Sequence, residues 1–123
     1  MRWMCTVALG GIVACAAPAF SFEGLRDVHV TNVAADAPAA FCADFLLSNA
    51  QAAAALKRAA RITQEQYLQQ FHFLPCYVRG TAQLGGDPVQ WEIRAGGNGT
   101  IMTADDEVIY LGCESCARTF GAP

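Results

Sequence analysis

The spacing of Cys113 and Cys116 is the one feature of the sequence that is typical of redox chemistry. In thiol–disulfide oxidoreductases a C-x-x-C motif follows a strand and starts a helix, whose dipole lowers the pKa of the first thiol. A strand is predicted before Cys113, but Ala117–Pro123 is too short for a supporting helix and no βαβ unit surrounds the motif. We expect a structural disulfide here, with a redox pair as the alternative.

Other candidates for catalysis or metal binding have little support in the sequence. His29 and His72 are the only histidines, and there is neither a G-x-S-x-G elbow nor an H-E-x-x-H pair. The cysteines could form a zinc site, but a second C-x-x-C is missing and an oxidising compartment favours disulfides. The sequence therefore predicts no enzymatic activity, no cofactor and no bound metal.

Two further segments could contact ligands but are more typical of turns. Gly96–Thr100 is rich in glycine, yet it lacks the Lys-Ser/Thr pair of a phosphate-binding loop, and Asn98-Gly99 is typical of a type I′ hairpin turn. Asp105-Asp106-Glu107 could contact a cation, but adjacent acidic residues usually form a solvated turn. We interpret both segments as turns.

A surface for binding is predicted on a β-hairpin. Apolar residues alternate with polar ones along Cys76–Leu84 and again along Val89–Arg94, which predicts two strands with one buried face. Tyrosine and arginine on the opposite face combine contact area with directional hydrogen bonds, as protein interfaces do. An ordinary solvated face is the alternative. The predicted binding residues are Tyr77, Arg79, Glu92 and Arg94.

The register of this hairpin decides which charges meet. If Leu84 pairs with Val89, Arg79 lies opposite Arg94. Like charges directly opposite one another are unfavourable unless Glu92 bridges them or a partner supplies an anion.

Two helices are predicted before the hairpin. Ser48 followed by Gln51 has the spacing of a capping box and predicts a helix over Ala52–Ile62. Thr63 repeats this spacing and predicts a second helix to about Gln70. The side chains expected to face a sheet are Leu56, Ala59, Ala60, Tyr67, Leu68 and Phe71.

The remaining patterns predict strands and turns. Leu25–Val33 is expected to form a first strand, and Phe41–Leu47 a short strand or the lead-in to a helix. A turn over Gly85–Pro88 is followed later by strands over Thr100–Thr103 and Glu107–Gly112. The expected fold is a single disulfide-bonded α+β domain, with two helices packed on an antiparallel sheet of four to six strands.

The N-terminus has the organisation of a secretory signal peptide. Arg2 precedes an uncharged run that ends in small residues, with cleavage expected after Ala19 or Ser21. The run is short for a membrane span, which needs about 20 apolar residues. The alternative is a lipobox, Ile12-Val13-Ala14-Cys15, with cleavage before a lipidated Cys15. Residues 1–21 are thus predicted to be the signal peptide and residues 22–123 the domain.

Four cysteines lie in the predicted domain: Cys42, Cys76, Cys113 and Cys116. An even number in an exported chain predicts two disulfides, with three possible pairings. We favour Cys42–Cys76, which would close a loop over the helical segment and contribute about 3–4 kcal/mol, together with Cys113–Cys116. A domain of this size needs such cross-links because its core is small.

Composition narrows the class of partner. The chain has 8 Lys and Arg against 11 Asp and Glu, a net charge of −3, which excludes a nucleic-acid binder built on a basic surface. With 54% hydrophobic and 15% charged residues, the chain is not an acidic disordered protein.

Three segments, Phe41–Ser48, Leu74–Thr81 and Trp91–Gly97, resemble small uncharacterised exported bacterial proteins of unknown function. The resemblance spans about residues 25–116. It implies export and structural roles for the Cys, Trp and Gly-Gly positions, and it assigns no site.

These patterns together predict a small periplasmic or secreted protein without catalytic activity. We expect an inhibitor-like or accessory factor that binds another envelope or extracellular protein through its sheet face. The alternatives are a redox protein using Cys113 and Cys116, and a structural envelope lipoprotein that contacts the membrane through Cys15.

Overall fold

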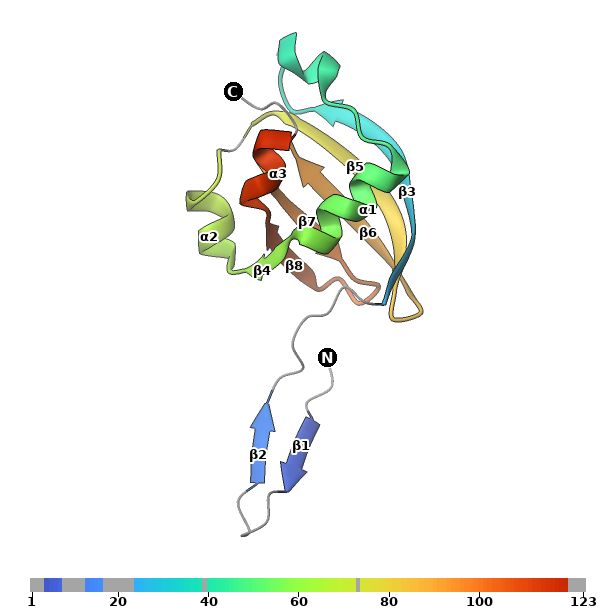
Figure 1. The fold of residues 1–123 in the computed structure, drawn as a ribbon, viewed down its shortest axis with the longest axis vertical. Helices are drawn as coiled ribbons and strands as arrows, with labels where there is room; N and C mark the ends of the chain where they lie inside the picture. The colour runs from blue at the N-terminus through green and yellow to red at the C-terminus, as the bar shows by residue number, and fades with distance from the viewer. Residues whose placement is uncertain (1–3, 8–12, 17–23, 39, 73, 120–123) are drawn as a thin grey trace.

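A six-stranded antiparallel sheet forms the centre of the domain in the computed structural model, which describes residues 4–7, 13–16, 24–38, 40–72 and 74–119 (Figure 1). The strand order is β3-β5-β6-β7-β8-β4. This confirms the α+β class, with the sheet at the upper limit of the expected size. The strands are β3 (Leu25–Ala35), β4 (Ala60–Ile62), β5 (Cys76–Leu84), β6 (Asp87–Arg94), β7 (Asn98–Met102) and β8 (Val108–Gly112).

Among the described residues, three short α-helices and one 3-10 helix accompany the sheet. Both capping boxes are present: the Ser48 and Thr63 side chains each accept a hydrogen bond from the backbone N–H three residues later, at 3.1 Å. The segment that was expected to be a strand or a lead-in to a helix contains the 3-10 helix. The helices are η1 (Ala40–Asp44), α1 (Asn49–Arg58), α2 (Gln64–Gln69) and α3 (Glu114–Thr119).

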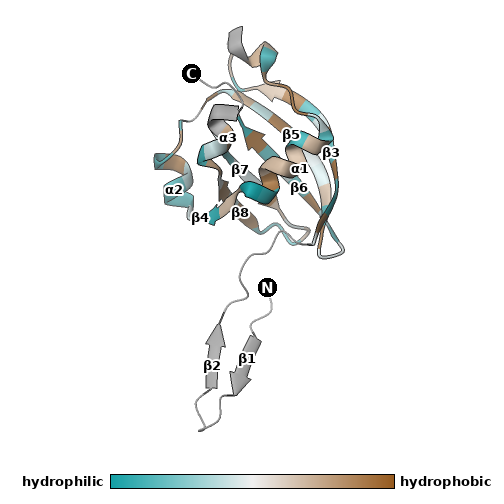
Figure 2. Ribbon diagram, viewed as in Figure 1, coloured by the Kyte–Doolittle hydropathy of each residue, from teal (hydrophilic) through white to brown (hydrophobic). Residues whose placement is uncertain are grey.

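The core lies between α1 and one face of the sheet, which we call the inner face. Leu56 on α1 is 1% exposed, and Val78, Trp91 and Ile101 on the strands are equally buried. Hydrophobic and hydrophilic residues alternate along β5 and β6, as expected for strands with one buried face (Figure 2). The N–H of Val30 donates to Asn49 Oδ1 at 2.8 Å, which joins edge strand β3 to the start of α1.

The first predicted helix ends earlier than expected. It stops at Arg58, and Ala60–Ile62 pairs with β8 as strand β4 instead. This pairing satisfies backbone groups that β8 would otherwise expose at the edge of the sheet. Ala60 therefore does not face the sheet from a helix, and Leu68 on α2, also expected to face the sheet, is 57% exposed.

The β5–β6 turn is tighter than predicted. Gly85 and Gly86 both have positive φ, 61° and 87°, and form a two-residue hairpin turn that pairs Leu84 with Asp87. The predicted pairing of Leu84 with Val89 is therefore wrong. Because β6 starts directly after the two glycines, the facing residues of the hairpin are displaced by two positions from the predicted register.

The next turn also differs from the prediction. Asn98-Gly99 lies inside strand β7, which starts before the predicted Thr100–Thr103, and the chain turns at Gly97, whose φ is 92°. Gly99 is needed within the strand, since a Cβ there would lie 2.5 Å from the carbonyl oxygen of Glu92.

Both favoured disulfides are present, Cys42–Cys76 and Cys113–Cys116. Cys76 and Cys116 are 1% and 2% exposed and belong to the core. The expectation that no helix accompanies the C-x-x-C motif is wrong, because α3 begins at Glu114 and includes Cys116.

The N-terminal segment contains a separate two-stranded antiparallel sheet of β1 (Met4–Val7) and β2 (Val13–Ala16). The predicted cleavage positions after Ala19 and Ser21 lie outside the described residues. Among the residues that the structure describes, no helix has the length and apolar character needed to cross a membrane.

Candidate functional site

The four predicted binding residues lie together on the face of β5 and β6 opposite the core, which we call the outer face. In the observed register Arg79 lies opposite Glu92, and Tyr77 lies opposite Arg94. The unfavourable pairing of Arg79 with Arg94 does not occur. Each basic side chain instead has an acidic or aromatic neighbour across the strand pair.

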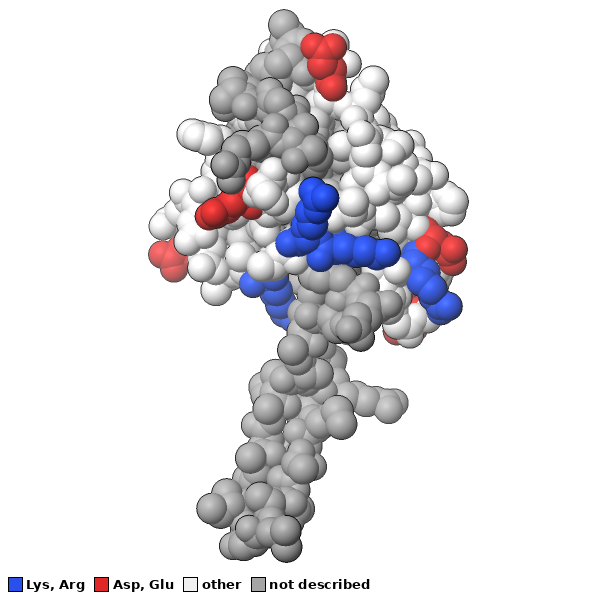
Figure 3. Space-filling model, in the orientation of Figure 1, with Lys and Arg blue, Asp and Glu red and all other residues white. Residues whose placement is uncertain are grey.

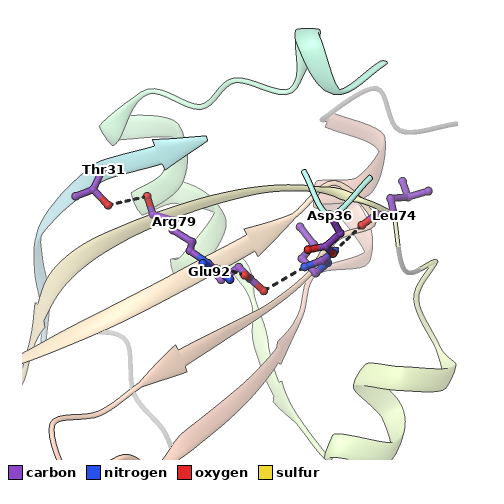
Figure 4. A network of polar contacts seen from close by, with 6 residues as sticks. Thr31, Asp36, Leu74, Arg79 and Glu92 are labelled. Carbon is purple, nitrogen blue, oxygen red and sulfur yellow. Dashed lines mark hydrogen bonds and ion pairs between the residues drawn. The ribbon is translucent and has the colours of Figure 1, made fainter. Parts of the chain in front are cut away.

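Glu92 joins the two arginines of this cluster. Its Oε1 accepts a hydrogen bond from Arg79 Nε at 2.9 Å, and its Oε2 lies 3.4 Å from Arg94 Nη1 (Figure 4). Both guanidinium groups also lie against the ring of Tyr77, 4.5 and 5.1 Å from its centroid. The hydrogen bond to Glu92 raises the pKa of Arg79, so this residue keeps its positive charge.

Arg94 is buried, contrary to its predicted place on an exposed surface. It is 3% exposed, forms an ion pair with Asp36 and donates to the carbonyl oxygen of Leu74 at 2.9 Å. Asp36 follows β3 and Leu74 precedes β5, so two distant segments cover this end of the outer face. Arg94 thus joins three parts of the chain and is inaccessible to a partner.

Helix α2 covers a second part of the outer face. Tyr67, 6% exposed, packs against Tyr110 of β8 with ring centroids 5.1 Å apart. Burial raises the pKa of Tyr67, and the negative charge of Glu92 raises it further. The ring of Phe71 lies over Gly112, where a Cβ would be 2.5 Å from it.

The rest of the outer face remains open and forms a cavity of about 740 Å³, which we call the outer groove. Arg79 and Glu92 lie on one side of it, and Tyr67 and Tyr110 on the other. A second cavity, of about 490 Å³, shares Thr81, Gln90 and Met102 with the outer groove and continues toward Asp27 and Asp106. The residues that characterise the outer groove are Tyr67, Arg79, Gln90, Glu92, Thr100 and Tyr110.

Several groove residues were missed by the sequence analysis. Alternation along β8 places Tyr110 on the face of Thr100 and Glu92, and this signal was available. Tyr67 was expected to face the sheet, but its helix has no pattern that selects the outer face over the inner one.

The Cys113–Cys116 pair lies away from the outer groove. The two residues are 7% and 2% exposed and border a cavity of about 20 Å³ beneath Leu56 of α1. The Cys113 N–H donates to the carbonyl oxygen of Gly97 at 2.7 Å, and Ser115 Oγ lies 3.6 Å from Cys113 Sγ. A reductant would have to reach sulfur atoms that belong to buried residues.

Both histidines are exposed, and His29 Nδ1 lies 3.5 Å from Asn49 Nδ2. Within the described part of the chain, no group of three or more His, Cys, Asp or Glu side chains is placed to hold a metal ion.

Comparison with known proteins adds no relative: the chain matches no protein-family model, and no curated protein or solved structure shows significant similarity to it.

Proposed function

We propose that this chain is a small exported binding protein without catalytic activity, an inhibitor-like or accessory factor that contacts a partner protein through the outer groove. One observation carries the proposal. Other segments of the chain cover the outer face at Arg94 and Gly112, whereas the surface between Arg79 and Tyr110 is open.

The open part has the composition of a contact surface. Met102 is 42% exposed and lines the outer groove together with Tyr110 and the charged pair of Arg79 and Glu92. These side chains project from a hydrogen-bonded sheet, so little backbone conformational entropy is lost when a partner binds them. A partner is therefore expected to gain both apolar contact and oriented hydrogen bonds here.

The disulfides support export to the periplasm or the medium, because such bonds persist in oxidising compartments. With the predicted signal peptide, the partner is expected to be another envelope or extracellular protein. Lipidation of Cys15 would place the same groove at a membrane surface.

A redox role for Cys113 and Cys116 is the second candidate, because Cys113 directly precedes helix α3. Burial of both cysteines argues against rapid exchange. The two functions separate in the Cys113→Ser variant: redox activity would be lost, whereas recovery of a bound partner would be unchanged.

The proposal is tested by pull-down from the envelope fraction of the source organism. Met102→Lys places a charge on the outer groove and is expected to abolish recovery of the partner. Lys57→Glu is the control, since Lys57 is exposed on α1, which covers the inner face. Basic side chains gather near the centre of the side of the molecule drawn in Figure 3. Equal recovery with both variants would contradict the proposal.

A further inference from the structure

Arg79 is the charged side chain of the outer groove that is both held in place and accessible. Its side chain is 54% exposed, its Nε donates to Glu92, and its guanidinium lies 4.5 Å from the centroid of Tyr77. Thr31 Oγ1 also donates to the Arg79 carbonyl oxygen at 3.4 Å, which links β3 to β5 at this residue (Figure 4). The guanidinium is therefore positioned before any partner binds.

The terminal amino groups of Arg79 are still available. An arginine has five N–H donors, and the bond to Glu92 uses the one on Nε. Neither Nη1 nor Nη2 donates to any residue that the structure describes. These two groups form a planar fork at the edge of the outer groove, and such a fork matches two oxygens of one planar anion.

The charge around the fork selects the kind of anion. Arg79 and Arg94 contact Glu92 and Asp36, so two positive charges face two negative ones. Because these four charges balance, the second negative charge of a phosphate monoester would gain no net attraction from the cluster. A carboxylate carries one charge and has the planar geometry that the fork requires.

The shape of the surface selects a chain segment over a small molecule. The outer groove is open and continues into the second cavity through Thr81, Gln90 and Met102. An extended segment could follow this path and place an apolar side chain on exposed Met102.

We propose that Arg79 binds the carboxylate of an Asp or Glu side chain in an extended segment of the partner protein. This inference rests on the proposed function and specifies the chemistry of its partner. It makes Arg79 a determinant of specificity, whereas Arg94 only supports the cluster.

The test begins with phage-displayed random linear peptides selected on the immobilised full protein. We expect Asp or Glu at a fixed position of the enriched peptides, next to an apolar residue. The affinity of the most enriched peptide is then measured for the wild type, Arg79→Gln and Arg58→Gln. Arg58 is exposed on α1, on the opposite side of the sheet, and its variant makes the same chemical change.

Arg79→Gln should weaken binding at least about tenfold, the loss expected for a charge-assisted hydrogen bond, and Arg58→Gln should leave it unchanged. Changing the acidic residue of the peptide to its amide should weaken binding to the wild type by a similar factor and have little effect on Arg79→Gln. The comparison of the two peptides on the wild-type protein remains informative even if Arg79→Gln folds poorly.

The outcomes separate the two proposals. In one outcome, the peptides shift the NMR signals of the backbone amides of Gln90, Thr100 and Tyr110 but bind Arg79→Gln as tightly as the wild type. This result would overturn the role of Arg79 and leave the outer groove as the binding surface. Peptides that bind elsewhere, or a selection without enrichment, would overturn both.

Discussion

Arg79 and Arg94 contact the same glutamate, yet their surroundings give them different roles. Arg94 is buried beneath Asp36 and Leu74, whereas more than half of the Arg79 side chain is exposed. Removing one member of a buried ion pair leaves the other charges without compensation, and exposed pairs contribute little.

We therefore expect Arg94→Gln to lower the free energy of unfolding by about 3 kcal/mol, and Arg79→Gln by about 0–1 kcal/mol. Urea denaturation followed by fluorescence measures both values. Similar losses for the two variants would show that burial does not separate their roles.

Tyr67 should titrate above the ordinary tyrosine value of about 10, since burial raises its pKa. Because the raised pKa belongs to the folded state, its contribution to stability is complete below the ordinary value of about 10 and is lost as the pH rises through the folded value. Absorbance titration of the phenolates should show a late-titrating group that disappears in Tyr67→Phe. Tyr77→Phe serves as the control and should retain the late group.

Among the elements, the helix starts and the alternating strands were predictable because their causes are local. The capping boxes at Ser48 and Thr63 need only neighbours in sequence, and alternation along β5 identifies the buried face. Strand β4 was not predictable, because it forms only by pairing with the edge of β8, which is distant in sequence. The burial of Arg94 likewise depends on Asp36, which is distant in sequence.

Close approach of β5 to its two neighbouring strands, β3 and β6, depends on Gly80. A Cβ at this position would lie 2.0 Å from the His29 carbonyl oxygen and 2.2 Å from the Trp91 ring. Gly80→Ala should therefore lower stability by about 1–3 kcal/mol, as overpacking does. Gly86→Ala is a useful comparison, since no atom lies within 4 Å of the added Cβ and the substitution tests only the positive φ of 87°. Thermal unfolding of the two variants distinguishes steric overlap from backbone strain.

At the scale of the whole molecule, the two disulfides should contribute unequally. Cys42–Cys76 spans 34 residues and ties η1 to the start of β5, whereas Cys113–Cys116 spans 3. In the chain-entropy model the long loop contributes about 3–4 kcal/mol and the short one much less. Denaturation of Cys42→Ser/Cys76→Ser and Cys113→Ser/Cys116→Ser should show this order, and a larger loss for the second pair would contradict it.

Under the proposed function, the inner face of the sheet supports stability and the outer face supports binding. The inner face is covered by α1 and holds the core, and the outer face carries α2 at one end and the open groove beside it. The outer face is also covered around Arg94, which is bonded to Asp36 and Leu74. Arg79 and Glu92 therefore lie at the border between the covered and the open part of the outer face.

Site-specific photocrosslinking in the source organism tests most directly whether the outer groove binds the partner. A photoreactive phenylalanine derivative is placed at Gln90, which is exposed in the outer groove, or at Lys57, which is exposed on α1. We predict a crosslinked species of one discrete mass from position 90 that is absent from position 57. Crosslinking from position 57 alone, or from neither position, would contradict the assignment of the binding surface.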